Sequence, residues 1–257
     1  RVSMALNTMS KFYYGHNVTS SNSKIDFKEG AGSQLTATLE VGDYSLTEFG
    51  VELSRALNAA GALTYTVTIA RATRFITIAA TGTITLLAAT GTSISNGAWT
   101  LAGFVATDVT GTSLAGTAAS GSEFLPQFKL QKYISFDDQE SSSYSSVNKS
   151  AGGTVEVVSF GTENFLNCDI VYQTNTTQVS GSAIEHQANG LDNLRTFMQY
   201  VTKKRKIEFI PDRDTTAFTK CLLESTSSSG DGTGFVLNEY LGTLPGYFST
   251  GTLRFRK

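Results

Sequence analysis

The sequence is poor in the side chains that most enzymes use for chemistry. Its 257 residues include two histidines, two cysteines and one tryptophan. No pair of histidines or cysteines has zinc-ligand spacing, and no G-x-S-x-G or S-x-x-K motif precedes a helix. We therefore predict a protein that is not an enzyme, with no catalytic residues, no cofactor and no metal.

Charge is scarce, and one long segment has almost none. Charged residues make up 16% of the chain, and the formal net charge is −2. Between Phe75 and Ser122 the only charged residue is Asp108. A free soluble surface normally carries more charge, so we expect residues 75–122 to be covered by neighbouring copies or by another protein. The small net charge also predicts no sequence-specific nucleic-acid binding.

Long apolar runs are missing as well. No stretch reaches the ~18 apolar residues of a membrane-spanning helix, so we expect no membrane partner. The segment Arg1-Val-Ser-Met lacks the apolar core of a signal peptide. We expect Cys168 and Cys221 to be buried free thiols of a chain made in the cytoplasm, with a disulfide as the alternative.

What the chain does contain favours β-structure. Threonine is abundant beside valine, isoleucine, phenylalanine and tyrosine, while proline occurs three times. In Gln34–Leu39 apolar and polar residues alternate, which is the pattern of a half-buried strand. Tyr65–Ile69 and Phe75–Ile78 have the same alternation and predict an antiparallel hairpin.

One helix is predicted between these strands, over residues 45–60. Ser45 and Glu48 form an S-x-x-E capping box at its start. Gly61 is expected to end it with a positive φ angle. A single apolar stripe runs along it, formed by Phe49, Leu53, Ala56 and Leu57, and we expect Trp99, Leu101 and Phe104 to cover this stripe.

The composition divides the chain into three parts. Residues 1–23 are predicted to be a polar, irregular N-terminal arm, and residues 24–122 an inserted α+β domain. Residues 123–257 are predicted to be mainly β, with one helix over 191–201. Closing strands are expected at Ile207–Pro211, Thr219–Thr226 and Gly246–Arg256.

The titratable residues mostly suggest surface roles. His16 and His186 lie in polar, turn-rich settings and are expected on the surface. Residues 137–150, with an acidic cluster and a run of serines, predict a mobile loop. Two carboxylate pairs could serve acid–base chemistry or bind calcium, although solvated loops are the simpler interpretation: Asp137 with Glu140, and Asp212 with Asp214.

Two further motifs are candidate binding sites. Ser229–Gly234 superficially matches a phosphate-binding loop but lacks the following Lys-Ser/Thr and helix, so it predicts a β-turn. Lys203–Lys206 follows the predicted second helix, where cations satisfy the terminal carbonyls. Contact with an acidic face of a neighbouring subunit, or with DNA, remains as an alternative for this basic run.

Two stretches resemble known proteins. Tyr44-Ser-x-x-Glu48, Ala56–Gly61, Tyr65–Thr68, Phe75–Ile78 and Leu101-Ala-Gly-Phe104 together resemble a module common in virion structural proteins of tailed bacteriophages. The closing Leu-Gly-Phe of that module is one residue longer here. The C-terminal part is similar to phage tail and baseplate proteins, in the segments Arg205–Asp212, Cys221–Ser225, Leu244–Tyr247 and Thr252–Arg256.

The resemblance implies a mainly β fold: a β-sandwich of the tail-tube or distal-tail kind, with one flanking helix and an inserted small α+β domain. It implies a structural tail or baseplate component in the virion, which assembles as a homo-oligomeric ring and contacts other virion proteins. No catalytic residues carry over, because such families have none. The alternatives are a neck, head-completion or capsid-decoration protein, a receptor- or carbohydrate-binding adhesin, or a glycosidase fragment.

Overall fold

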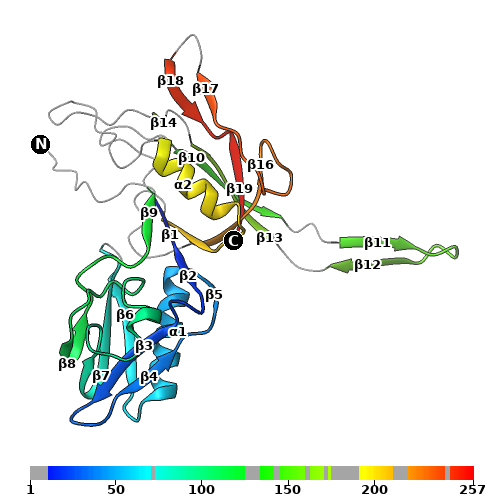
Figure 1. Cartoon of the computed structure of the whole chain (residues 1–257). Helices are drawn as coiled ribbons and strands as arrows, with labels where there is room; N and C mark the ends of the chain where they lie inside the picture. The colour runs from blue at the N-terminus through cyan, green and yellow to red at the C-terminus, as the bar shows by residue number, and fades with distance from the viewer. Residues whose placement is uncertain are drawn as a thin grey trace, which may run out of the picture. The chain divides into compact units, whose positions relative to one another are not determined.

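The computed structural model describes residues 11–70, 73–124, 134–141, 145–159, 163–170, 173–174, 191–210, 219–240 and 244–257. Over these residues the protein is mainly β, with several antiparallel sheets and two α-helices, α1 (Leu46–Ala60) and α2 (Leu191–Val201) (Figure 1). The chain divides into two compact units. Unit 1 comprises Arg1–Lys11, Phe124–Arg205 and Phe209–Lys257; unit 2 comprises Phe12–Glu123 and Lys206–Glu208. Three of the four divisions fall within strands, β1 (Lys11–Tyr14), β9 (Ser122–Phe124) and β15 (Ile207–Ile210), and the fourth lies just before β15.

The centre of unit 2 is the long strand β7 (Phe75–Leu86). Its first half pairs with β6 (Tyr65–Ala70), which confirms the predicted hairpin, and its end pairs with β3 (Lys24–Glu29). β3 pairs in turn with β4 (Leu35–Thr38). β8 (Val109–Ala115) runs along the opposite side of β7, because Thr77 pairs with both Thr68 and Ala115. A register shift between Ala79 and Ile84 divides the β7–β8 ladder. β4, β6 and β8 are therefore the edges of this sheet.

Helix α1 begins as its sequence predicts. The backbone N–H of Glu48 donates to Ser45 Oγ over 3.3 Å, and the Ser45 N–H donates to Glu48 Oε2 over 3.0 Å. This capping box satisfies two backbone donors at the start of the helix and confirms the prediction. Phe49, Leu53 and Leu57 are fully buried, so the predicted apolar stripe is also confirmed.

The end of α1 corrects the sequence analysis. Gly61 is extended, with φ −103°, and does not take the positive φ expected of it. Its N–H donates to the Leu57 carbonyl, and a Cβ at this position would lie 2.4 Å from Glu29 Oε1 and 2.8 Å from the Tyr65 ring. Glycine is therefore required by the close approach of two side chains, and backbone strain plays no part.

The core of unit 2 lies between α1 and the sheet. The helix stripe packs with Ile76 and Ile78 of β7 and with Phe27 of β3, which meets the Tyr65 ring edge-on. Trp99 and Phe104 are buried in the same cluster, their rings in a T-shaped contact, while Leu101 is partly buried against it. These three residues therefore belong to the cluster that contains the helix stripe, and their direct cover of the stripe stays a prediction.

The first residues of unit 2 differ from the expected irregular arm. Residues 1–10 lie outside the described residues, but Lys11–Tyr14 form β1 and His16–Val18 form β2, which pairs with β5 (Gly42–Tyr44). Phe12 and Tyr13 are fully buried. Burial of these aromatic rings stabilises the strands. The polar residues beside them in the sequence suggested an irregular segment instead.

Unit 1 contains a larger antiparallel sheet in the order β10-β13-β19-β16-β15. Its strands include β13 (Glu163–Ile170), β16 (Thr219–Thr226) and β19 (Thr252–Arg256). Helix α2 has the predicted bounds and buries Leu194, Phe197, Met198 and Val201. Phe197 stacks on Phe124 with ring centroids 4.9 Å apart. A separate small sheet has the order β14-β18-β17, formed by Gln173–Thr174, Leu244–Ser249 and Asn238–Tyr240.

Side chains also link the strands of the larger sheet in unit 1. The Arg254 guanidinium lies 3.8 Å from the centroid of the Phe165 ring. Arg256 pairs with Glu163 over 2.5 Å and with Glu224 over 2.6 Å, which joins β13, β19 and β16. Cys168 and Cys221 are buried and free, as expected.

The acidic cluster is the second clear correction. The expected mobile loop over residues 137–150 includes β10 (Ile134–Ser141), which pairs with β13 so that Asp137 lies opposite Asn167 and Glu140 opposite Asn164. β11 (Ser145–Lys149) and β12 (Val155–Ser159) then pair with each other. Local composition suggested a loop, but cross-strand hydrogen bonding to distant residues makes strands here.

Removal of the capping box provides a test of the α1 boundary. We expect Ser45→Ala to lower the free energy of unfolding of unit 2 by about 1 kcal/mol, because the Glu48 N–H loses its acceptor. Trp99, the only tryptophan, is buried in this unit, so its emission during urea unfolding measures the change. Ser33→Ala, at an exposed serine, is the matched control, and an equal effect of the two changes would contradict the assigned cap.

Candidate interaction surfaces

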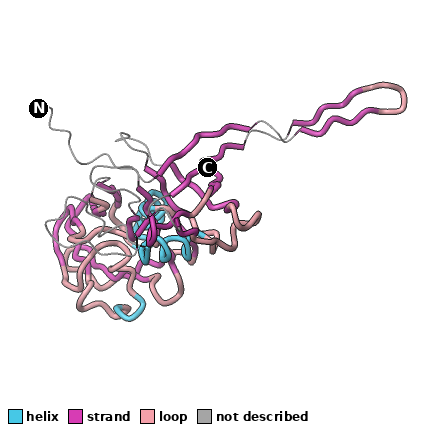
Figure 2. The backbone as a smooth tube through the Cα atoms, turned by 90° about the horizontal axis from the view of Figure 1, so that it is seen from above, coloured by secondary structure: helices cyan, strands magenta, loops and turns pink. Residues whose placement is uncertain are grey.

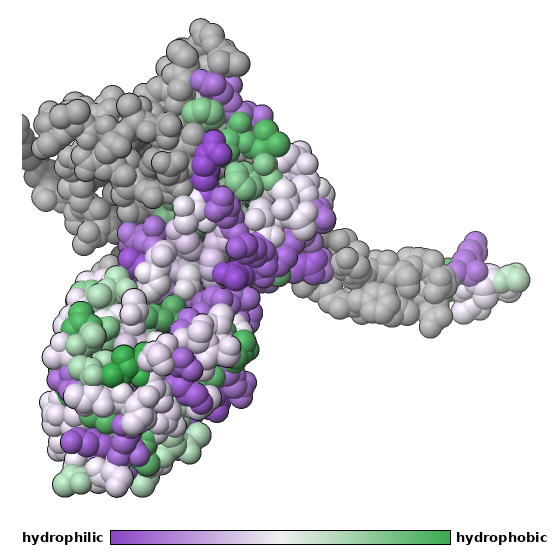
Figure 3. Space-filling view, viewed as in Figure 1, coloured by the Kyte–Doolittle hydropathy of each residue, from purple (hydrophilic) through white to green (hydrophobic). Residues whose placement is uncertain are grey.

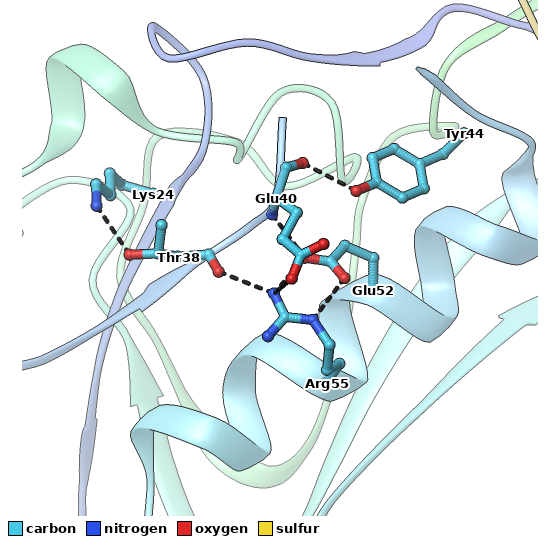
Figure 4. A network of polar contacts seen from close by, with 6 residues as sticks. All are labelled: Lys24, Thr38, Glu40, Tyr44, Glu52 and Arg55. Atoms are coloured by element: carbon cyan, nitrogen blue, oxygen red, sulfur yellow. Dashed lines mark hydrogen bonds and ion pairs between the residues drawn. The ribbon is translucent and has the colours of Figure 1, made fainter. Parts of the chain in front are cut away.

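A polar network joins α1 to the strand β4 and the residues that follow it (Figure 4). Glu52 Oε1 accepts the Glu40 N–H over 2.7 Å, and both oxygens of Glu52 bind the Arg55 guanidinium. Arg55 also donates to the Thr38 carbonyl over 3.2 Å. Burial alone would raise the pKa of Glu52, but the hydrogen bonds from Arg55 and Glu40 outweigh it and lower the pKa. The ion pair therefore persists at neutral pH.

Three other carboxylates in unit 2 hold loops by accepting hydrogen bonds. Asp26, which is buried, accepts the Ser93 N–H and the Thr36 hydroxyl, each over 2.6 Å. Glu29 Oε1 accepts the N–H groups of Ala62 and Leu63 and the Tyr65 hydroxyl, bonds that together lower its pKa. These two carboxylates fix the loops that donate to them.

Asp108 precedes β8 directly. Its Oδ1 accepts the Ala89 N–H over 2.8 Å and the Thr90 N–H over 3.2 Å, and Oδ2 accepts the Thr90 hydroxyl. Burial raises its pKa, but these bonds, with the charge of Lys28, outweigh that effect and lower it. The carboxylate is therefore ionised at neutral pH, and it is the lone charge of the neutral segment 75–122.

A segment distant in the sequence completes unit 2. Glu208 is fully buried, and its Oε1 accepts the Thr47 N–H over 2.8 Å at the start of α1. Lys206 pairs with Glu48 over 3.2 Å on the same turn. A carboxylate at a helix N-terminus is favoured by the unsatisfied N–H groups and the dipole. No spacing in the sequence links residue 208 to residue 47, so sequence reasoning could not identify this contact.

His16 corrects the expectation of a surface histidine. It is fully buried, its ring lies 5.5 Å from that of Phe49, and Nε2 lies 3.2 Å from Ser120 Oγ. Ser120 Oγ in turn donates to the Leu101 carbonyl, and Nδ1 of His16 has no hydrogen-bond partner in the described structure. Ser120 is itself fully buried, so this Ser–His pair is closed to a substrate.

The other candidate catalytic residues have no described side chains. Asp212, Asp214 and His186 lie outside the described residues, and the side chains of Asp137 and Glu140 do as well. Among the residues that the structure describes, no group of three or more potential metal ligands occurs. Within the same residues, no helix is long and apolar enough to cross a membrane. The predicted absence of enzymatic activity thus stays a prediction.

The basic run and the glycine-rich segment contact each other. Ser229–Gly234 is a turn, as predicted, in which the Asp231 carboxylate accepts bonds from Ser229 and Thr233, which lower its pKa to about 2. The Lys204 ammonium donates to the carbonyls of Leu223, Glu224 and Asp231. The expected contact of Lys204 with the helix carbonyls is therefore replaced by one with β16 and this turn.

The three edges of the unit 2 sheet differ in how their outer backbone groups are satisfied. At β6, Asn58 of α1 both donates to the Tyr65 carbonyl and accepts the Tyr65 N–H, each over 2.9 Å. At β4, Arg55 donates to the Thr38 carbonyl. Among the described residues, no hydrogen bond reaches the outer backbone of β8, which lies at the margin of the sheet in Figure 1.

The ribbon formed by β11 and β12 has two unpaired edges. Its strands pair with each other and with no other described strand (Figures 1 and 2). Val155 at its end is exposed. The ribbon continues the register of the β10–β13 pair, since Ser141 lies opposite Glu163 and Ser145 opposite Ser159, so it belongs to the same antiparallel hairpin.

Where the structure describes side chains, the large apolar ones that are exposed are aliphatic. The large ones are Val41, Val51, Ile94, Val105, Val109, Val155 and Val236. Figure 3 shows apolar patches among weakly polar residues on the visible face of unit 2, its lower body in that view. A scan against protein-family profiles finds no match, and no curated protein matches the sequence.

The buried His16 predicts a pH dependence for unit 2. Burial first, then the nearby Arg74 cation, lowers the His16 pKa from 6.5 to about 4. The unfolded chain therefore binds more protons between these values, and stability falls as the pH falls through this window. We expect a loss of about 2 kcal/mol between pH 7.5 and 5.0 in urea unfolding followed by Trp99 emission.

A matched pair of variants isolates this histidine. His16→Gln should be less stable at pH 7.5 but should lose most of the pH dependence, whereas His186→Gln should keep it. An unchanged pH profile in His16→Gln would show that other groups cause the acid sensitivity.

Proposed function

We propose that this chain is a non-enzymatic structural subunit of a tailed-phage virion, namely a tail or baseplate ring component that assembles as a homo-oligomer. For the fold we propose a β-sandwich of the tail-tube or distal-tail kind. Unit 2 is then the domain inserted into this β-sandwich. The resemblance of residues 44–104 and of the C-terminal segments supports the virion assignment, and the strand edges support the assembly.

The observation that carries the assembly proposal is the pair of open edges on the β11–β12 ribbon. It leaves two rows of backbone N–H and C=O groups without strand partners in the described part of the chain. Natural proteins normally block such edges, since they invite pairing with other chains. In a closed ring of identical copies each edge finds the same partner, so pairing stops at a defined size.

The exposed side chains favour an assembly role over carbohydrate binding. Sugar-binding platforms use exposed aromatic rings, whereas Trp99 is buried in the core of unit 2. The large apolar side chains exposed among the described residues are valines and one isoleucine. Aliphatic residues scattered among polar ones fit contact between protein surfaces better than stacking on sugar rings.

The oligomeric state provides the direct test. We expect the purified chain to form a defined oligomer in light scattering. In a variant in which Asn-Gly replaces residues 145–159, we expect an oligomer of fewer copies, with unchanged Trp99 emission. The deletion removes strands that contact no other described strand, so unit 2 should fold normally. A stable monomer of the full chain at high concentration would overturn the assembly proposal.

Location on the particle tests the virion assignment. Antibodies raised against unit 2 and coupled to gold should label the tail or baseplate of phage particles from cells that express this chain. Labelling at the neck or on the capsid surface would favour the alternative assignments, and particles without label would refute a place in the virion.

A further inference from the structure

The open edge of β8 and the unpaired ribbon are complementary features of one chain. β8 has seven residues, none of them charged, and no proline. All except Gly111 and Leu114 are exposed. Edges β4 and β6 receive hydrogen bonds from α1, whereas the outer side of β8 receives none in the described structure. The contrast within one sheet indicates that β8 is open for a partner strand.

We propose that β8 is the docking edge for strand β11 of the ribbon in a second copy of this chain, paired antiparallel. This inference rests on the proposed homo-oligomer and names the surfaces that join its copies. The pairing would complete both incomplete features at once, since β8 gains an outer neighbour and the ribbon gains a third strand. β8 and β11 do not pair within one chain.

Charge sets the direction and the choice of strand. In an antiparallel pair the start of one strand lies towards the end of the other, and we align the end of β11 with the start of β8. The end of β11, Lys149, then lies beside Val109 and close to the ionised Asp108. Lys149 is exposed and is the only charge on β11, as Asp108 is within residues 75–122.

The alternative arrangements lack this complementarity. A parallel arrangement of β12 would bring Glu156 towards Asp108, which places like charges together. An antiparallel arrangement of β12 would place Ser159 there, with no charge to pair. The antiparallel approach of β11 is the one that sets an opposite charge against Asp108.

Cross-linking between marked copies tests the pairing directly. Thr112→Cys in β8 and Ser146→Cys in β11, which lie opposite each other when Lys149 pairs with Val109, are made in separate chains with different tags, co-expressed and treated with a short bismaleimide. Thr112 is exposed, whereas the native Cys168 and Cys221 are buried, so the unmodified chain gives the background. We expect cross-links that join the two tags and few that join identical tags.

Each other outcome has a definite meaning. Cross-links between two Thr112→Cys chains would show that β8 pairs with its own counterpart and would overturn the inference. An intact oligomer without cross-links between the tags would overturn the inference while leaving the proposed assembly standing. A monomer would overturn both.

Charge variants test the register independently. We expect Lys149→Glu to weaken association about three- to tenfold at low salt, because it places a carboxylate beside Asp108, and expect Lys149→Arg to preserve it. Glu156→Lys, on β12, is the control and should have a smaller effect. Equal weakening by Lys149→Glu and Glu156→Lys would contradict the choice of β11.

A lysine in the edge itself provides the last comparison. Thr112→Lys should disrupt association, whereas Thr68→Lys, at an exposed position on the β6 edge, should not. Unchanged Trp99 emission confirms that unit 2 remains folded in both. Loss of association with Thr68→Lys alone would assign the docking edge to β6 and overturn the inference.

Discussion

The constraint on which the structure depends is that every strand must find partners for the backbone groups on both of its sides. In unit 2 the inner strands meet it through β7, which pairs with β3, β6 and β8. At two of the outer strands, side chains of α1 supply part of what a further strand would provide. The helix therefore has two roles, since its apolar stripe forms the core and its polar face protects the sheet edges.

The polar side chains of unit 2 serve this same framework. Asp26, Glu29 and Asp108 each accept hydrogen bonds from backbone N–H groups of a loop, and Glu208 does so at the start of α1. Carboxylates with these partners are fixed in place as acceptors. This arrangement accounts for many of the acidic residues of the unit and gives them a structural reason to be present.

Local signals in the sequence predicted the elements that local hydrogen bonds define. The Ser45–Glu48 capping box and the apolar stripe gave the start and the inner face of α1, and the alternation of residues gave the β6–β7 hairpin and β16. The α2 bounds followed from its apolar spacing. Prediction was wrong where distant pairing decides, as in β10, whose acidic composition suggests a loop until β13 pairs with it.

The sequence alone determined the β-rich character, the position of both helices and the neutrality of residues 75–122, because each follows from residue type and short-range spacing. Only the tertiary structure decided that His16 is buried, that Gly61 is extended and that Glu208 binds the start of α1. Those features depend on contacts between residues far apart in the chain, which no local pattern encodes. The sequence also does not show which strand edges are open, because an edge is open only when no other strand of the fold pairs with it.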